Sequence, residues 1–135
     1  MKKYYLTKEV LKELIYGTQK NKNYLGVQLE ELLKKNDSFY ISLSSLEEIL
    51  KAEESLEKRK VIFKNVNDLC DTILEERLDD TGNALSLQTE YLVDHERAME
   101  LTLASRYQLD AMLTISNRFD FQKMISVFQL VLKGK

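Results

Sequence analysis

Three short apolar runs in this chain are separated by long segments with helical spacing, and this alternation is the feature that most constrains the fold. The runs are KYYL (3–6), SFYISL (38–43) and AMLTI (111–115). Short runs rich in aromatic and aliphatic side chains are typical of buried strands. Strands separated by helices favour right-handed crossovers and a parallel sheet with helices on both faces. We therefore predict an α/β fold, formed as one domain over all 135 residues.

The segments between the runs predict the helices. Thr7 is a suitable N-cap for a helix over 8–17, and Gly17 suits its C-terminal end. The chain contains no proline, so the strongest helix breaker is absent. The other predicted elements are a helix over 24–35, a helical region over 44–80 with a break between 54 and 58, a turn at 81–83, one or two helices over 84–107, and a helix or strand-containing end over 121–133.

The composition excludes several classes of protein. The net charge of −2 argues against a broad, nonspecific nucleic-acid-binding surface, although it leaves room for a small basic groove. Cys70 is the only cysteine, so no disulfide forms within the chain and a reducing cytoplasm is the expected location. His95 is the only histidine, which argues against a zinc site. No apolar run approaches the roughly 18 residues of a membrane span, so we expect no membrane segment.

In a parallel sheet, ligands gather at the carboxyl ends of the strands. In this chain the predicted strand ends lie near Thr7, over 44–48 and over 114–117. The hydroxyl, carboxylate and amide side chains at these three places are therefore the first candidates for a functional site.

The same three places resemble the PIN-domain family, the nuclease-like fold of the VapC toxins and of many stand-alone bacterial and cyanobacterial proteins. YYLTKEVLKELI resembles the opening strand and helix of that family, and FYISLSSLEEIL resembles its second strand and the helix that carries a Glu. DHERAMELTLASRYQLDAMLTISNRFDF resembles its closing section. The resemblance extends from residue 3 to residue 121, and it implies a PIN-like single domain with a central parallel sheet flanked by helices.

The resemblance also implies a metal-dependent ribonuclease site, in which three or four carboxylates hold Mg²⁺ or Mn²⁺ and the metal activates water. Only part of that site is present here. Thr7 replaces the first Asp, Glu48 fits the second acidic position, and Arg97 replaces the third acidic residue beside a retained Glu96. Ser116 or Asn117 follows where the fourth acidic or polar residue is expected. The retained acidic positions are therefore Glu48 and Glu96, and the degenerate ones are Thr7, Arg97 and Ser116.

Each retained acid also has a simpler interpretation. Glu48 is either a ligand or part of a capping box with Ser45, as Glu47 would be with Ser44. Glu9 stands where the family often has Asn, and it either reaches a metal or favours the helix N-terminus by its charge.

Asp94 and Arg97 are three residues apart and therefore share one face of a helix. They form either an ion pair or, with Glu96, a substitute acidic site. Arg97 either points into the cleft, where it neutralises Glu48 or Glu96 or binds a phosphate, or lies on a rotated helix and points to solvent.

Three functions are consistent with the sequence. The first is a degenerate PIN-domain protein, catalytically weak or inactive, that has no metal cofactor and acts by binding RNA or an antitoxin-like protein partner. The second is an active Mg²⁺- or Mn²⁺-dependent ribonuclease of VapC toxin type, with ligands drawn from Glu9, Glu48, Asp94, Glu96 and Asp120. The third is a structural or regulatory subunit. The family often forms dimers, so we expect a homo-oligomer, with the helices over 24–35 or 45–60 as candidate contacts.

Overall fold

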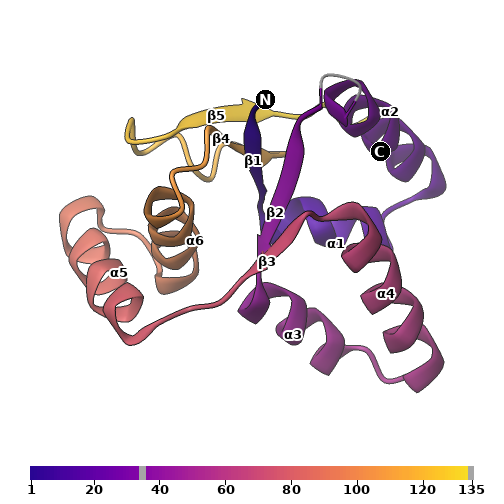
Figure 1. The fold of residues 1–135 in the computed structure, drawn as a ribbon, viewed down its shortest axis with the longest axis horizontal. Coiled ribbons are helices and arrows are strands. Elements are labelled where there is room, and N and C mark those ends of the chain that lie inside the picture. The colour runs from indigo at the N-terminus through magenta and orange to yellow at the C-terminus, as the bar shows by residue number, and fades with distance from the viewer. Residues whose placement is uncertain (34–35, 134–135) are drawn as a thin grey trace.

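The fold is a five-stranded parallel sheet with helices on both faces, as the computed structural model shows (Figure 1). The structure describes residues 1–33 and 36–133. The strand order is β3-β2-β1-β4-β5, and every neighbouring pair is parallel. The strands are β1 (Lys3–Leu6), β2 (Ser38–Ser42), β3 (Thr72–Leu74), β4 (Ala111–Thr114) and β5 (Ser126–Gln129). The predicted α/β class, with a central parallel sheet flanked by helices, is confirmed.

The central strand β1 aligns the strand ends on which the candidate site depends. Tyr5 of β1 pairs with Tyr40 of β2 on one side and with Met112 of β4 on the other. Tyr5 and Leu6 are fully buried, because β1 is covered on both faces and flanked by strands on both edges. The carboxyl ends of β1, β2 and β4 therefore lie side by side at one edge of the sheet.

Helices form a layer on each face of the sheet. They are α1 (Lys8–Tyr16), α2 (Gln19–Leu33), α3 (Leu43–Ala52), α4 (Leu56–Leu69), α5 (Leu78–Tyr91) and α6 (His95–Arg106). One core cluster joins side chains of the first four helices to the sheet, including Leu11, Leu25 and Ile49. A second cluster places Leu101 and Leu103 of α6 against the opposite face. Each face thus buries an apolar layer, which is the main stabilising contribution in such a fold.

Two predicted segments differ from the structure. The region over 44–80 contains α3 and α4 with the expected break, but it also contains the short edge strand β3, which was not predicted. The turn predicted at 81–83 is wrong, since these residues lie inside α5. The end over 121–133 contains β5, which confirms the strand-containing alternative. The predicted helix over 24–35 corresponds to α2, and residues 34–35 of that prediction lie outside the described residues.

The turn prediction failed because contacts distant in sequence hold α5 together. Asp80 is fully buried and accepts hydrogen bonds from Arg106 Nε (2.7 Å) and Nη2 (3.0 Å). Asp80 also accepts a hydrogen bond from the backbone nitrogen of Arg77 at the helix start (2.8 Å). These bonds fix the first turn of α5, so the Thr81–Gly82–Asn83 sequence continues as helix.

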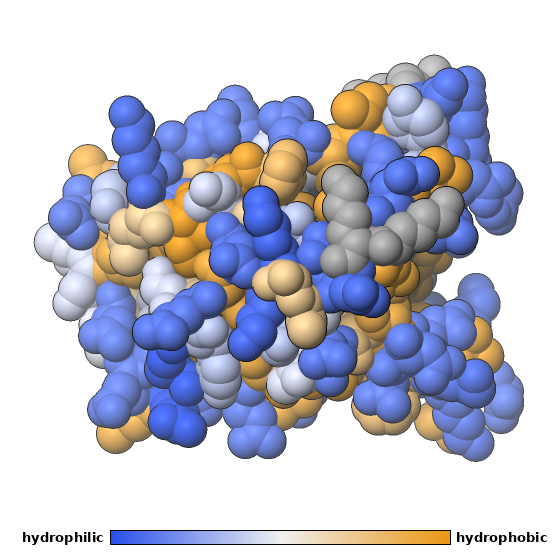
Figure 2. Space-filling view, turned by 45° about the horizontal axis from the view of Figure 1, so that its top comes forward, coloured by the Kyte–Doolittle hydropathy of each residue, from blue (hydrophilic) through white to orange (hydrophobic). Residues whose placement is uncertain are grey.

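The outer surface is polar, with separate apolar patches. On the face shown in Figure 2, hydrophilic side chains surround several distinct hydrophobic areas. In residues 1–33 and 36–133, no helix is both long and apolar enough to cross a lipid bilayer.

Candidate functional site

A cleft of about 350 Å³ lies at the carboxyl end of the sheet, next to the ends of β1 and β2. Serine side chains at the end of β2 and the start of α3, together with carboxylates of α3 and α6, line it, including Ser42, Ser45, Glu48, Glu96 and Glu100. The structure therefore brings Glu48 and Glu96 together at the position that the strand ends predicted.

Lys8 lies beside this cleft and pairs with two of its carboxylates. Its side chain is almost completely buried, and its Nζ lies 2.5 Å from Glu48 Oε1 and 3.2 Å from Glu96 Oε2. Burial alone would lower the pKa of Lys8, but the hydrogen bonds with Glu48 and Glu96 outweigh it and hold the pKa above its ordinary value. The hydrogen bond from Lys8 lowers the pKa of Glu48. The ammonium group thus bridges the two retained carboxylates.

Arg118, from the loop after β4, supplies a second cation on the α6 side of the cleft. Its Nη2 lies 3.6 Å from Glu96 Oε1 and 4.0 Å from Asp94 Oδ2. Its Nε lies 4.0 Å from Glu9 Oε2. Three of the carboxylates considered from sequence, Glu9, Asp94 and Glu96, therefore surround one guanidinium group.

Glu9 is held by the segment that follows β4. Its Oε1 accepts hydrogen bonds from the backbone nitrogen of Ile115 (3.1 Å) and from Ser116 Oγ (2.9 Å), and its Oε2 lies 2.8 Å from Ser116 Oγ. This carboxylate consequently ties the start of α1 to the end of β4. The degenerate position Ser116 is its partner.

Arg97 lies beside this ion-pair network and not between Glu48 and Glu96. The ion pair predicted with Asp94 is present, since Arg97 Nε lies 3.3 Å from Asp94 Oδ2. The guanidinium donates from Nη1 to the backbone oxygen of Arg118 (3.2 Å) and lies 5.8 Å from the centroid of the Phe121 ring. Neutralisation of Glu48 or Glu96 by Arg97 was one alternative left open by the sequence, and these contacts are made by Lys8 and Arg118 instead.

The predicted capping role of Glu48 is wrong. Ser42 is the N-cap of α3, and its Oγ accepts a hydrogen bond from the backbone nitrogen of Ser45 (3.1 Å). The helix begins at Leu43, one residue earlier than expected, so its N-cap is Ser42 and neither Ser44 nor Ser45. Glu48 is instead free to reach Lys8.

Glu100 is a cleft residue that sequence reasoning missed. It is 4% exposed, and its Oε1 accepts hydrogen bonds from Tyr5 Oη (3.0 Å) and from the backbone nitrogen of Lys8 (2.8 Å). Burial raises its pKa to about 8. The sequence signal was a Glu in the otherwise apolar stretch around Leu101, where a buried acid requires a partner.

Of the remaining residues considered from the sequence, His95 lines the cleft, whereas Thr7 and Asp120 do not. Thr7 is fully buried, and its hydroxyl donates to the backbone oxygen of Leu113 (2.9 Å). His95 faces Gln88, with 3.0 Å between Nδ1 and Oε1. Asp120 is exposed, and its backbone nitrogen bonds to the oxygen of Asn117 (3.1 Å). Neither Thr7 nor Asp120 supplies a carboxylate to the cleft.

The residues of this cleft do not fit a divalent metal ion. Within residues 1–33 and 36–133, no group of three or more His, Cys, Asp or Glu side chains has an arrangement that could hold one. The physical reason is that Lys8 and Arg118 lie among the carboxylates, where a divalent cation would need open oxygen ligands.

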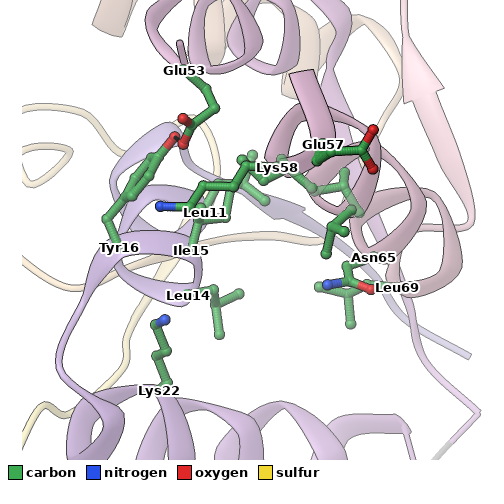
Figure 3. A pocket seen from close by; sticks show the side chains of 13 residues that line it. Leu11, Leu14, Ile15, Tyr16, Lys22, Glu53, Glu57, Lys58, Asn65 and Leu69 are labelled. Atoms are coloured by element: carbon green, nitrogen blue, oxygen red, sulfur yellow. Dashed lines mark hydrogen bonds between the residues drawn. The ribbon is translucent and has the colours of Figure 1, made fainter. Parts of the chain in front are cut away.

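A second hollow, the apolar groove, lies between α1, α2 and α4 and has a volume of about 590 Å³ (Figure 3). Its walls are Leu11, Leu14, Ile15, Val61, Ile62 and Leu69. Lys22 of α2 and Lys58 of α4 extend over these apolar side chains. At one end, Tyr16 donates a hydrogen bond from its hydroxyl to Glu53 Oε1 (3.0 Å).

The structural comparisons agree with this architecture. No family model and no curated protein sequence matches the chain. Among solved structures, it is similar to VapBC2 from Rickettsia felis bound to a promoter DNA fragment, with 16% identity, a TM-score of 0.75, and coverage of 94% of this chain and 98% of the other. A toxin–antitoxin complex from Klebsiella pneumoniae has 17% identity and a TM-score of 0.70, over 96% and 99% of the two chains. VapBC-1 from nontypeable Haemophilus influenzae has 9% identity and a TM-score of 0.72, over 95% and 98%.

These similarities define the class of protein by its fold, which is PIN-like and complete over almost the whole chain. The particular proteins that share this fold come from toxin–antitoxin complexes. Because the identities are low, the likeness establishes the fold alone, and the chemistry has to be argued from the residues of this chain.

Proposed function

We propose that this chain is a PIN-fold protein of VapC-like descent whose cleft does not bind a catalytic metal, and that it acts by binding a protein partner. The observation that carries the proposal is the Lys8 ammonium, which contacts both Glu48 and Glu96. These are the two retained acidic positions of the sequence. A lysine at this place supplies the positive charge that a metal would otherwise provide.

Electrostatics support this assignment. Two carboxylates that lie close together repel unless a cation compensates them, and a lysine does so without any bound ligand. Arg118 compensates Glu96 further and lies near Glu9 and Asp94. A divalent ion would have to displace both cationic side chains, at the cost of their ion pairs. Metal affinity is consequently low in the wild-type chain, and so is any hydrolysis that depends on the metal.

A protein partner is favoured over RNA by the surface of the molecule. The chain has a net charge of −2, which disfavours a broad contact with the phosphates of RNA. The apolar groove has the opposite character, since it offers aliphatic walls to a helix with apolar side chains. The charged residues at its rim are two lysines and two glutamates, Lys22, Lys58, Glu53 and Glu57. The solved structures with this fold are complexes with antitoxins, which supports a partner of that kind.

Metal titration tests the proposal directly. Thermal unfolding of the wild-type chain is measured with millimolar Mg²⁺ or Mn²⁺ and with sodium at matched ionic strength. We expect the same Tm in both conditions, because the cleft has its own cations. The Lys8→Ala/Arg118→Ala double variant is expected to gain a metal-dependent rise in Tm, and a Lys20→Ala variant on the exposed surface of α2 is the control.

The alternative function is an active Mg²⁺- or Mn²⁺-dependent ribonuclease of VapC toxin type. The metal titration of the wild-type chain, combined with an RNA cleavage assay, tests it as well. A wild-type chain whose Tm rises with Mn²⁺, and whose RNA cleavage is abolished by Glu48→Gln or Glu96→Gln, would establish that function and overturn the proposal. Cleavage that survives both substitutions would point to a contaminating nuclease and leave the proposal standing.

A further inference from the structure

Strand β5 is the last strand of the sheet, and its outer edge is open. Within the described part of the chain, β4 is the only strand that pairs with it. Figure 1 shows β5 along the margin of the molecule, with no helix beyond it. Ser126, Phe128 and Gln129 are exposed, whereas Val127 is partly buried. Such an edge presents backbone N–H and C=O groups in the arrangement with which a further strand pairs.

The alternation of the backbone identifies the groups that are open. The backbone nitrogen of Leu130 donates to the oxygen of Thr114 in β4 (2.6 Å). Successive residues of a strand direct their backbone groups to opposite edges, so Phe128 also faces β4, whereas Val127 and Gln129 face outward. These two residues therefore offer two N–H and two C=O groups at the outer edge.

Glutamine side chains occupy the backbone groups on both sides of this opening. Gln122 donates from Nε2 to the oxygen of Ile125 (3.0 Å) and accepts at Oε1 from its nitrogen (3.0 Å). Gln28 does the same for Val131, with 2.8 Å to the oxygen and 2.9 Å to the nitrogen. Each amide binds both backbone groups of one residue, as a neighbouring strand does. The outward groups of Val127, between the two bound residues, and those of the following Gln129 are left for another chain.

The two edges of the sheet differ in their protection against pairing. Strand β3 has three residues and is bordered by Asp71 and Glu75. Short strands and flanking charges are the usual protection of an exposed edge. Residues 124–132, which contain β5, include no charged side chain and no proline, and the nearest charges are Lys123 and Lys133. The β5 edge is therefore typical of an edge that another strand covers.

The opening is symmetric about Phe128, and this symmetry identifies the strand that fits. Two copies of β5 that pair antiparallel about a two-fold axis at Phe128 place each Val127 opposite Gln129 of the other copy. The outward groups of these residues then form four backbone hydrogen bonds. In the same register Ile125 meets Val131, and both are already bonded to glutamine, so the paired stretch ends there.

The side chains of β5 are compatible with this pairing. The two Phe128 residues would face each other as a non-hydrogen-bonded pair, in which the side chains lie closest, and aromatic pairs of this kind stabilise antiparallel strands. Phe128 is 51% exposed, and its ring centroid lies 6.2 Å from that of Tyr4, so the ring is supported by its own chain and still accessible. Because residues 124–132 are uncharged, a second copy brings no like charge into the paired stretch.

We propose that β5 is the self-association edge of this chain, through which two copies join their sheets by antiparallel pairing of their β5 strands. Residues 126–129 lie outside the linings of the cleft and of the apolar groove, so the inference goes beyond the proposed function and does not depend on it. The surface also differs from the two helices considered from the sequence as dimer contacts. Four hydrogen bonds and one aromatic pair make a small interface, so we expect a weak dimer with a dissociation constant in the micromolar range.

Sedimentation equilibrium of the full-length chain, over about 1–500 µM, tests the association. Val127→Pro removes an outward N–H without removing a bond to β4, and it therefore eliminates two of the four hydrogen bonds between the copies. Gln129→Lys places a charge at the edge. Each variant should raise the dissociation constant at least about tenfold. Thr72→Lys, at an exposed position of β3 on the opposite edge, is the matched control and should leave the constant unchanged.

Phe128→Cys tests the register of the pairing. At the two-fold axis the Cα atoms of the two introduced cysteines would lie about 4.5 Å apart, so mild oxidation should give a disulfide-linked dimer. Ser126→Cys is the control, because its two copies would lie about 14 Å apart in this register. The native Cys70 is buried, so the wild-type chain should remain unlinked.

Three outcomes would overturn the inference. The first is a wild-type chain that remains monomeric at every concentration. The second is a dimer that Val127→Pro and Gln129→Lys leave intact, or that Thr72→Lys weakens equally. The third is equal cross-linking of Phe128→Cys and Ser126→Cys, which would indicate random collision. Circular dichroism reports the fold of each variant, and if Val127→Pro disturbs it, Gln129→Lys decides.

Discussion

The polar cleft and the apolar groove differ in how the chain compensates the side chains that line them. In the cleft, Lys8 and Arg118 of the chain itself neutralise the carboxylates of Glu48 and Glu96. In the groove, Leu14, Ile15 and Val61 line open space, and no side chain of residues 1–33 and 36–133 fills it. The cleft has internal partners for its charges, whereas the groove has apolar surface that only another molecule can cover.

The difference has a physical origin. Charged groups in a cleft must be compensated at every moment, because an unpaired and partly buried charge costs several kcal/mol. Exposed apolar surface costs less per residue and is tolerated in the unbound state. The carboxylates of the cleft therefore need a cation beside them at all times. The fold remains intact when the groove is empty.

The largest expected effect lies in the cleft and depends on pH. Glu100 has a folded-state pKa of about 8, while an unfolded Glu titrates near 4.3. Between these values the folded state binds more protons than the unfolded state, so the free energy of unfolding falls as the pH rises from about 5 to 8. We expect a decrease of about 2–4 kcal/mol in urea denaturation across this range.

The Glu100→Gln variant serves as the control for that pH dependence. Its side chain keeps an oxygen for the hydrogen bonds from Tyr5 and Lys8 but has no proton to release. The slope between pH 5 and 8 should largely disappear. A wild-type chain with constant stability over this range would show that Glu100 is ionised throughout, and the contrast between the two hollows would then weaken.

The second effect is smaller and concerns the internal cation. Lys8→Met keeps the length and the apolar stem of the side chain but removes the charge between Glu48 and Glu96. Both carboxylates are partly exposed and can be hydrated, so the expected loss is about 1–2 kcal/mol and not the larger value of a fully buried pair. Urea denaturation at pH 7 measures it. Lys12→Met, an exposed position on the same helix, should change stability by less than about 0.5 kcal/mol.

The sequence predicted the framework of this site better than its electrostatics. The strands β1, β2 and β4 were predicted within one residue, because apolar runs and helical spacing are local signals. The convergence of the strand ends followed from the parallel sheet. The role of Lys8 did not follow, since Lys8 and its carboxylate partners lie far apart in the sequence. Arg97 was a candidate site residue because it replaces an expected acidic residue. In the structure its guanidinium contacts the loop at Arg118 and Phe121.

The edge strand β3 was also beyond what sequence patterns predict. Strand β3 has only three residues, and its position follows from pairing with β2 through Ile41 and Ile73. Three residues give too short a pattern for periodicity to detect. Glu100 could have been noticed from its apolar neighbours, but its partner Tyr5 is distant in the chain. Contacts of this kind are properties of the folded topology, and single-sequence patterns do not encode them.

The third prediction concerns the apolar groove. A naphthalene dye should bind the native chain there through its rings, because the groove has aliphatic walls and its two lysines are balanced by Glu53 and Glu57. Val61→Glu should weaken this binding at least about tenfold, which corresponds to about 1.4 kcal/mol. Val27→Glu is the matched control, since both valines are 57% exposed and Val27 does not line the groove. Equal dye fluorescence in the two variants would show that the groove is not the binding site.

The smallest expected effect compares an ion pair of the cleft with one on the outside of α4. Lys8 and Glu48 are held at 2.5 Å with the lysine buried, whereas Lys64 and Asp68 are 3.1 Å apart and both exposed. A double-mutant cycle isolates each coupling. We expect about 0.3–0.5 kcal/mol for the exposed pair, reduced further in 0.5 M salt, and about 1 kcal/mol or more for the cleft pair, with weaker dependence on salt. If the two coupling free energies were equal and fell equally with salt, the Lys8–Glu48 pair would contribute no more to stability than an exposed ion pair. Its position between Glu48 and Glu96 would then give no reason to exclude a metal from the cleft.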